Sequence, residues 1–557
     1  MKGKNAALLA GIGGLVLLVV VFVVLLGGGG GGDSGDGGDK ASANPTPGSG
    51  GGCDAPKGTD LRLLGPEPID LDPALIRDAG SAQYAVEVFS GLVQLNAELK
   101  VVPDIAESWT ISPDGKVYTF TLRKNALFHV DERAVTADDF KFSLDRAAKL
   151  GRTLSTTADA YLGDIVGVRD VILGKSESIS GVKAINATTL EITIDAPKPY
   201  FLAKMTYPTA YVVERSQVTA NPERWWYKPK GTGPYKVRTW EIGERIILEA
   251  NEKYYGGAPK IKQILFNLAG GSSLTQFENC EIDVSGLGID DLERVQSAGD
   301  PLHDQYVTGP ELALSYIGFS VKTPPFDDPK VRQAFAISID RDQLTRVVGK
   351  DASPVATSFM MPGLPGYNPN AKLPAFDPVR AKQLLQESKY GGASGLPKVR
   401  LTVAGGAGGA TVGAGLEAIQ QMWKQNLGVD VEINQVETAA FYDDLDRGRV
   451  QMWSLGWIMD YPDPEDLIDL LFYSKSRQNN SGYNNPQFDA LIEKARSEAN
   501  PEARLKLYQD AEQILIQDLP WMPLNFGQQH MVVNPHVKGY TVNKIIVPFL
   551  RNVTIEP

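Results

Sequence analysis

Four dipeptides in the second half of the chain mark helix starts in the same way. Each places Asp or Asn directly before Pro: Asp328-Pro329, Asp377-Pro378, Asn485-Pro486 and Asn500-Pro501. Asp and Asn side chains accept hydrogen bonds from the free N–H groups of a first helical turn, and Pro fits the first helical position because no N–H is needed there. Between these helices, residues 398–403 and 429–436 have strand patterns and flank an amphipathic stretch over 416–428. This strand–helix–strand order predicts a mixed α/β sheet.

Strand and helix patterns also alternate in the first half of the chain. Helices are expected from Ser81, as a cap, past Val86 to Leu92, and from the capping box Thr136–Asp139 onward. Strands are expected at 61–64, 117–122, 190–194, 235–240 and 245–249.

Length and charge limit the classes of protein that fit. At 557 residues the chain is too long for one ordinary core, so two or three domains are expected. The net charge of −12 argues against a nucleic-acid partner. The four His residues are scattered, which argues against a His-based metal site.

The glycine-rich loop 405–415 lies between a predicted strand and a predicted helix, where a dinucleotide fingerprint would lie. Its spacing fails, because Thr411 stands where the third glycine is needed. No phosphate-loop lysine follows, and no G-x-S-x-G nucleophile elbow is found in the sequence. We therefore predict no cofactor and no catalysis.

The sequence has two cysteines, Cys53 and Cys280. In an oxidising compartment they would form one long-range disulfide, and two unrelated free thiols are the equal alternative.

An uncharged apolar run over 6–26 follows Lys2 and Lys4. As a helix it would be roughly 30 Å long, enough to span a bilayer, and its positive flank would stay in the cytoplasm. We predict a membrane anchor or signal segment over 1–26, uncleaved by first choice, with cleavage in the following segment as the second. Residues 27–58 are rich in Gly, Asp, Ser and Pro and predict a flexible, disordered tether.

The stretch 454–464, SLGWIMDYPDP, sets Asp460 between the aromatic residues Trp457 and Tyr461. A carboxylate in such apolar surroundings is costly unless a cation or hydrogen-bond donors satisfy it. One interpretation is a ligand cation such as an ammonium group. The other is that Asp460 caps a neighbouring helix or pairs with a nearby Arg.

Seven segments of the sequence carry a joint resemblance to a known family: 71–75, 88–95, 102–147, 231–237, 324–344, 455–472 and 481–495. Taken together and in this order, they resemble the family 5 extracellular solute-binding proteins of ABC importers, the dipeptide- and oligopeptide-binding protein family. One departure is the turn at 130–132, which reads VDE where the family usually has His or Asp followed by Gly.

The resemblance implies a two-lobed Venus-flytrap fold of the periplasmic-binding-protein type with an extra inserted domain. The chain would cross between lobes near Gly309-Pro310 and again over 523–528, and the two crossings would form a hinge. The implied domains are lobe I (59–93, 201–308 and 526–557), the inserted domain (94–200) and lobe II (309–525).

The resemblance also implies a peptide site. Asp460 would hold the α-ammonium group of the peptide, Trp457 would line the pocket, and the backbone around Ile458 and Met459 would face the ligand. Gly456 and Tyr461 complete this part of the predicted site. On the other lobe, a strand over Glu67 to Ile69 would face the peptide.

The implied function is an extracellular, membrane-tethered receptor that captures short peptides and delivers them to an ABC permease with its ATPase subunits. It would be monomeric and bind no metal. An oligosaccharide, a metal chelate or an opine-like molecule is the alternative solute. A secreted hydrolase is the alternative of another class, and a receptor that presents its ligand to a sensor partner is a third.

Overall fold

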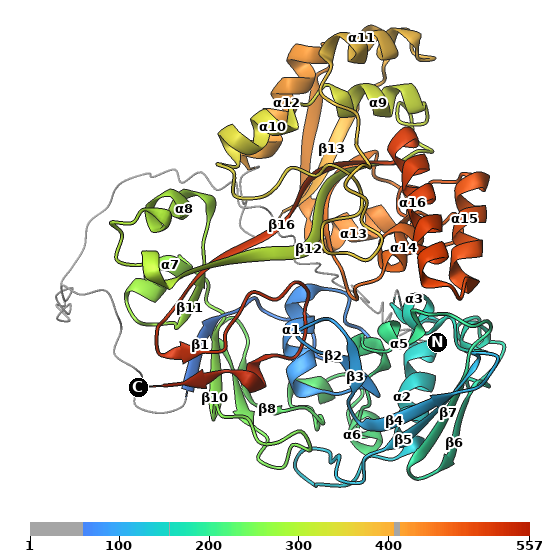
Figure 1. Ribbon diagram of the computed structural model, residues 1–557, viewed down its shortest axis with the longest axis vertical. Coiled ribbons are helices and arrows are strands. Elements are labelled where there is room, and N and C mark those ends of the chain that lie inside the picture. Colours follow the sequence, from blue (N-terminus) through green and yellow to red (C-terminus); the bar gives the residue numbers. More distant parts are fainter. Residues whose placement is uncertain (1–59, 155, 406–412, 557) are drawn as a thin grey trace, which may run out of the picture.

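The computed structural model describes residues 60–154, 156–405 and 413–556 (Figure 1). The predicted anchor (1–26), the predicted tether (27–58) and most of the glycine-rich loop lie outside these residues. Within the described ranges, no helix is long and apolar enough to cross a membrane.

One ten-stranded sheet runs through the molecule, in the order β14-β13-β15-β12-β16-β11-β1-β10-β9-β8. Parallel and antiparallel pairs both occur in it, as expected for a mixed α/β protein. Its strands are β1 (Asp60–Leu64), β8 (Tyr235–Glu241), β9 (Arg245–Ala250), β10 (Gln263–Asn267), β11 (Val284–Gly286), β12 (Tyr306–Phe319), β13 (Val399–Gly405), β14 (Val431–Glu437), β15 (Met452–Ile458) and β16 (Trp521–Val533).

Two long antiparallel strands, β12 and β16, join the two halves of this sheet (Figure 1). One end of β16 pairs with β11, and the far end of β12 pairs with β15. The β12–β16 register is interrupted between Pro310 and Leu314. Gly309 and Pro310 lie on β12, and 523–528 lies on β16, so both predicted crossings fall on these strands. The domain boundaries themselves stay a prediction.

A separate four-stranded sheet, β4-β5-β7-β6, packs against helix α2 (Ala137–Leu150) and has its own apolar core. The capping box at Thr136 and Asp139 is confirmed at the start of α2. The strands are β4 (Ala106–Ile111), β5 (Val117–Leu122), β6 (Val182–Asn186) and β7 (Thr189–Thr193).

The four Asp-Pro and Asn-Pro helix starts are confirmed. In each, Pro is the first helical residue and the preceding side chain accepts a backbone N–H of the first turn. The predicted strand–helix–strand unit is β13, α12 (Ala414–Leu427) and β14, with the two strands parallel. The four helices are α9 (Pro329–Ile337), α11 (Pro378–Glu387), α15 (Pro486–Ser497) and α16 (Pro501–Asp518).

Two local predictions are wrong. Helix α1 (Ala79–Val88) is capped by Asp78, whose extended backbone lets its carboxylate accept the Ser81 N–H, and α1 ends before Leu92. Residues 65–69 form no strand: β1 ends at Leu64, and Pro66 and Pro68 supply no N–H for a sheet ladder.

The remaining elements surround these sheets. The turn at 130–132 places Val130 and Glu132 at φ of 76° and 56°, the left-handed region that favours glycine. The other elements are β2 (Val93–Leu95), β3 (Val101–Pro103), α3 (Ala158–Leu162), α4 (Val168–Ile172), α5 (Phe201–Lys204), α6 (Arg215–Ala220), α7 (Ser273–Glu278), α8 (Ile289–Gln296), α10 (Arg341–Gln343), α13 (Thr438–Asp446), α14 (Ile468–Phe472), β17 (Val537–Lys538) and β18 (Thr554–Ile555).

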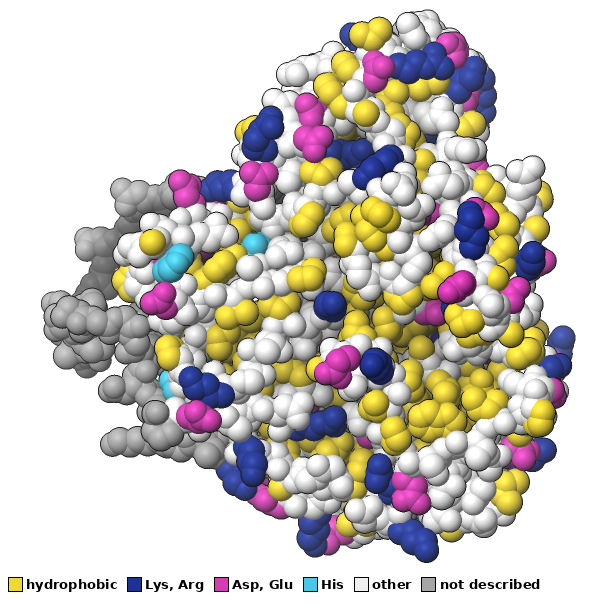
Figure 2. Space-filling model, in the orientation of Figure 1, with side chains coloured by type: hydrophobic (Ala, Val, Ile, Leu, Met, Phe, Trp, Pro, Cys, Tyr) yellow, Lys and Arg dark blue, Asp and Glu magenta, His cyan; other side chains and the backbone are white. Residues whose placement is uncertain are grey.

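Charged side chains of both signs are scattered over the face shown in Figure 2 rather than gathered into one basic patch. A nucleic-acid-binding face would need clustered Lys and Arg.

Candidate ligand-binding site

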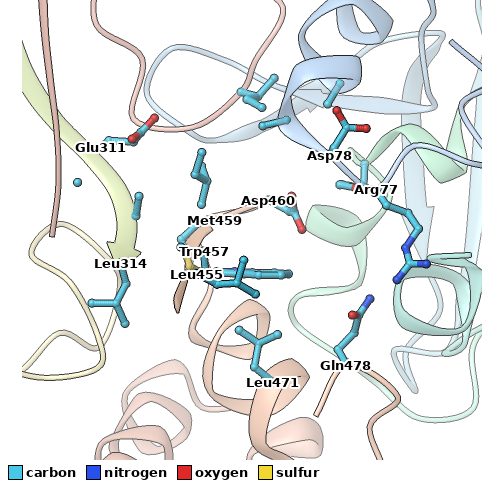
Figure 3. A pocket seen from close by; sticks show the side chains of 18 of the residues that line it. Arg77, Asp78, Glu311, Leu314, Leu455, Trp457, Met459, Asp460, Leu471 and Gln478 are labelled. Carbon is cyan, nitrogen blue, oxygen red and sulfur yellow. The ribbon is translucent and has the colours of Figure 1, made fainter. Parts of the chain in front are cut away.

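A cavity of about 180 Å³ lies where the two halves of the large sheet meet (Figure 3). On one side, its walls are α1, α3 and the segment 206–211. On the other side they are β15 and the end of α13, while β12, β16 and the segment 546–548 line it between these two sides. The cavity is therefore built from segments far apart in the sequence that the two long strands bring together.

Asp460 lies two residues after the end of β15 and reaches into this cavity. Its carboxylate accepts a hydrogen bond from the Tyr161 hydroxyl of α3. Among the described residues, Asp460 forms no ion pair with an Arg and caps no helix. The interpretation of Asp460 as a helix cap or as the partner of an Arg is therefore wrong. Desolvation raises the pKa of Asp460 to about 7, and the Tyr161 hydrogen bond opposes that rise.

Asp466 contacts both Asp460 and Trp457. It lies at the end of the short 3₁₀ helix Pro464–Asp466, is fully buried, and accepts the Asp460 backbone N–H at 2.8 Å. The Trp457 indole N–H also points at Asp466, at 3.4 Å. Burial and the neighbouring Asp460 charge raise the pKa of Asp466 well above its usual range. Asp466 therefore positions Trp457 and Asp460 through these two contacts.

Asp466 is not among the site residues predicted from the sequence, although the sequence does mark the start of its helix. Asp463-Pro464 repeats the helix-start dipeptide found elsewhere in the chain, and Asp463 caps the 3₁₀ helix.

Tyr461 points away from the cavity, contrary to its predicted place in the site. It is fully buried, and its hydroxyl donates to Glu465. Glu465 also pairs with Lys204 of α5 at 2.7 Å, and Lys204 pairs with Asp164 at 3.2 Å. Burial raises the pKa of Glu465 to about 7, against the opposing effect of Lys204. This buried cluster joins the β15 side of the cavity to the α3–α5 side.

The structure brings five of the eight predicted site residues together, and besides Tyr461 it leaves Glu67 and Ile69 elsewhere. Glu67 accepts hydrogen bonds from the Trp240 indole and the Gly243 N–H, both at 2.7 Å, near the β8–β9 hairpin. The Ile69 N–H donates to Ser81, and neither Glu67 nor Ile69 lines the cavity. The residues that line it are Gly456, Trp457, Ile458, Met459 and Asp460.

The acidic side chains that line the cavity outnumber the basic ones. Arg77 is the basic residue in its wall, and Asp446 lies 3.6 Å from it. Asp78 is occupied as the cap of α1. Glu311 and Asp460 are the other two acidic residues of the wall. The wall therefore favours a ligand that carries positive charge.

The described residues contain no group of three His, Cys, Asp or Glu side chains that could hold a metal ion. Cys280 is disulfide-bonded, and Cys53, the only other cysteine in the sequence, lies outside the described residues. The predicted pairing of these two residues stays a prediction.

The fold is the mixed α/β fold of substrate-binding proteins, and sequence comparison agrees. The model described as bacterial extracellular solute-binding proteins, family 5 Middle, matches residues 100–479. The chain belongs to this family.

Individual relatives cover nearly the whole described chain. The periplasmic oligopeptide-binding protein OppA of Salmonella typhimurium is 29% identical over 87% of this chain and 90% of its own length. The dipeptide-binding protein DppE of Bacillus subtilis is 28% identical over 85% of this chain and 87% of its own. The solved structure of the murein tripeptide binding protein MppA of Escherichia coli has a TM-score of 0.78 at 27% identity, covering 90% of this chain and 99% of that one.

A second structure of MppA, described as the unliganded open form, gives a TM-score of only 0.68 at the same identity.

Proposed function

We propose that this protein captures short peptides in the cavity between its two halves and delivers them to an ABC permease. The single observation that carries the proposal is Asp460. Its carboxylate reaches a cavity between two lobes, and its hydrogen-bond partner there is the neutral Tyr161 hydroxyl. A desolvated carboxylate with a neutral partner gains most from a cation that enters beside it.

The α-ammonium group of a peptide is such a cation. Asp460 would receive it, and the Trp457 ring would form the adjoining apolar wall. The backbone at 456–459 would lie along the peptide main chain, which lets one site accept varied side chains. The Met459 N–H is not available for this purpose, because it donates to the Leu312 carbonyl at 2.8 Å.

In this proposal the two predicted lobes close on the ligand by moving about β12 and β16. The proposal also includes the anchor at 6–26 as the tether to the membrane, with the cavity on the extracytoplasmic side. No enzymatic step is proposed, because the family is one of solute-binding proteins.

A non-peptide solute is the competing proposal. Two relatives bind other compounds by name: a probable deoxycholate-binding protein of Escherichia coli at 28% identity and a heme-binding protein of Haemophilus influenzae at 27%.

A thermal-shift screen of the purified 59–557 chain tests the proposal. It would compare di- to pentapeptide pools with deoxycholate, heme and oligosaccharides, and native mass spectrometry would identify any copurified ligand. We expect peptides to raise the melting temperature, because a ligand that binds only the folded state stabilises it by mass action. Stabilisation by a non-peptide alone, with no effect of any peptide pool, would overturn it.

A further inference from the structure

Glu311 is a second carboxylate in the cavity wall that the peptide proposal leaves unused. It lies on β12, is 8% exposed, and accepts one hydrogen bond, from the Gln529 side-chain amide at 2.7 Å. Among the described residues, no Lys, Arg or His forms an ion pair with it. Burial raises the pKa of Glu311 to about 7, opposed only by the Gln529 hydrogen bond.

The Glu311 side chain packs against β16. Gly527 of β16 packs directly against it, and a Cβ atom at Gly527 would lie 3.0 Å from the Glu311 Cβ and 2.8 Å from the Ala313 Cβ. Gln529, on the same strand, fixes one carboxylate oxygen. Glu311 lies where the β12–β16 pairing is interrupted, so the Gln529 hydrogen bond and the contact with Gly527 are what position it. A charge positioned in this way loses less freedom when a ligand binds.

Arg77, the basic residue of the cavity wall, lies away from Glu311. Arg77 is near Asp446, and in Figure 3 Arg77 and Asp78 lie on the far side of Met459 and Asp460 from Glu311. A desolvated carboxylate without a cation is costly to keep. A cationic group on the ligand would offset that cost.

Glu311 lies at the same end of the β12–β15 strand pair as Asp460, the proposed ammonium site. Strands β12 and β15 pair Ala313 with Ile458, and the Met459 N–H continues the pairing to Leu312. Glu311 and Asp460 therefore lie just past the same end of this strand pair. A peptide with its α-ammonium at Asp460 would present its first side chains to this end of the cavity.

We infer that Glu311 selects peptides that carry a basic side chain near the N-terminus, with the lysine or arginine cation beside its carboxylate. This inference rests on the proposed peptide function and names the substrate class within it.

Calorimetry with matched tripeptides tests the inference. Lysine would be compared with norleucine, which has the same aliphatic stem without the charge, at each position of an otherwise all-alanine tripeptide. We expect wild type to bind the lysine peptide at least about tenfold more tightly at the first or second position. In Glu311→Gln this preference should fall to about twofold or less, while the norleucine peptide keeps its affinity, because the new amide can still accept from Gln529.

Glu107→Gln is the matched control. It removes the same charge at an exposed position on β4, outside the cavity, and should leave the lysine preference unchanged. Melting temperatures check that each variant is folded.

The other outcomes separate the two proposals. If peptides bind but wild type has no lysine preference, or keeps it in Glu311→Gln, the role of Glu311 is overturned and peptide binding stands. If no tripeptide binds to wild type, the peptide function fails and the inference fails with it.

Discussion

At Asp460, desolvation and one neutral donor act on the carboxyl pKa in opposite directions. Desolvation dominates and raises the pKa to about 7, while the Tyr161 hydroxyl lowers it. Burial thus leaves this carboxyl with a raised pKa, and no Lys, Arg or His of the described residues forms an ion pair with it. A residue selected only for stability would be replaced or paired, so this cost points to a ligand.

A pH dependence of peptide binding follows from this pKa. An ammonium group binds the ionised carboxylate, so below about pH 7 a proton must leave before the peptide can bind. Tri-alanine affinity should therefore fall at least about tenfold between about pH 8 and pH 5.5, measured by calorimetry.

In Asp460→Asn the affinity should be low at both pH values and the dependence much smaller. Part of the pH dependence remains, because the pKa of Glu465 is also raised to about 7. A wild-type affinity that is constant, or that rises with acid, would contradict the assignment.

At the scale of elements, the turn after β15 is held by α16. Arg504 of α16 makes a two-pronged ion pair with Asp463, at 2.6 and 2.8 Å. Asp463 caps the 3₁₀ helix that ends in Asp466, and Asp466 holds the backbone of Asp460. This chain of contacts transmits the position of α16 to the cavity wall.

Arg504→Lys tests this support. Lysine cannot make the two-pronged contact, so we expect the turn to loosen and peptide affinity to fall about five- to tenfold, with a loss of about 1–3 kcal/mol in unfolding free energy. Affinity is measured by calorimetry and stability by denaturant unfolding.

Asn500→Ala is the control on the same helix. It removes the N-cap of α16 and should cost about 1 kcal/mol of stability without changing affinity. If the two variants lose affinity equally, the effect is one of general stability and the support model is wrong.

The sequence predicts some of these elements well and others not at all, for physical reasons. Helix starts at Asp-Pro and Asn-Pro are local, since the cap and the helix adjoin in the chain. The sequence predicts Ser81 as the cap of α1, whereas the cap is Asp78. Both are capping residue types three positions apart, and tertiary packing decides between them. The Tyr161–Asp460 contact spans 299 positions, and no local pattern signals a partner at that separation.

At the scale of the whole molecule, the two sides of the cavity are joined by polar contacts. Tyr161 and Lys204 lie on one side, and their partners Asp460 and Glu465 follow β15 on the other. Lys204 and Glu465 are both nearly fully buried. In the proposed closure about β12 and β16, these contacts would form only when the two sides of the cavity meet.

Glu465→Gln should shift this equilibrium. The amide keeps an acceptor for Tyr461 and Lys204 but loses the charge, so the closed form of the ligand-free protein loses part of its stabilisation. We expect a larger radius of gyration in small-angle X-ray scattering without ligand, and peptide affinity lower by about three- to tenfold.

Glu493→Gln is the matched control, because it removes one charge from an exposed pair with Lys475 on the same half of the molecule. It should change neither quantity. An unchanged radius and affinity in Glu465→Gln would show that this ion pair does not govern closure.

The central claim is that Asp460 binds the α-ammonium group of a peptide, and a two-by-two calorimetric cycle tests it most directly. A tripeptide with a free N-terminus and its N-acetylated form would each be measured against wild type and Asp460→Asn. We predict that acetylation weakens binding at least about 100-fold in wild type and less than about threefold in Asp460→Asn, because the variant has already lost the charge that the ammonium meets. Equal losses on acetylation in the two proteins would contradict the account.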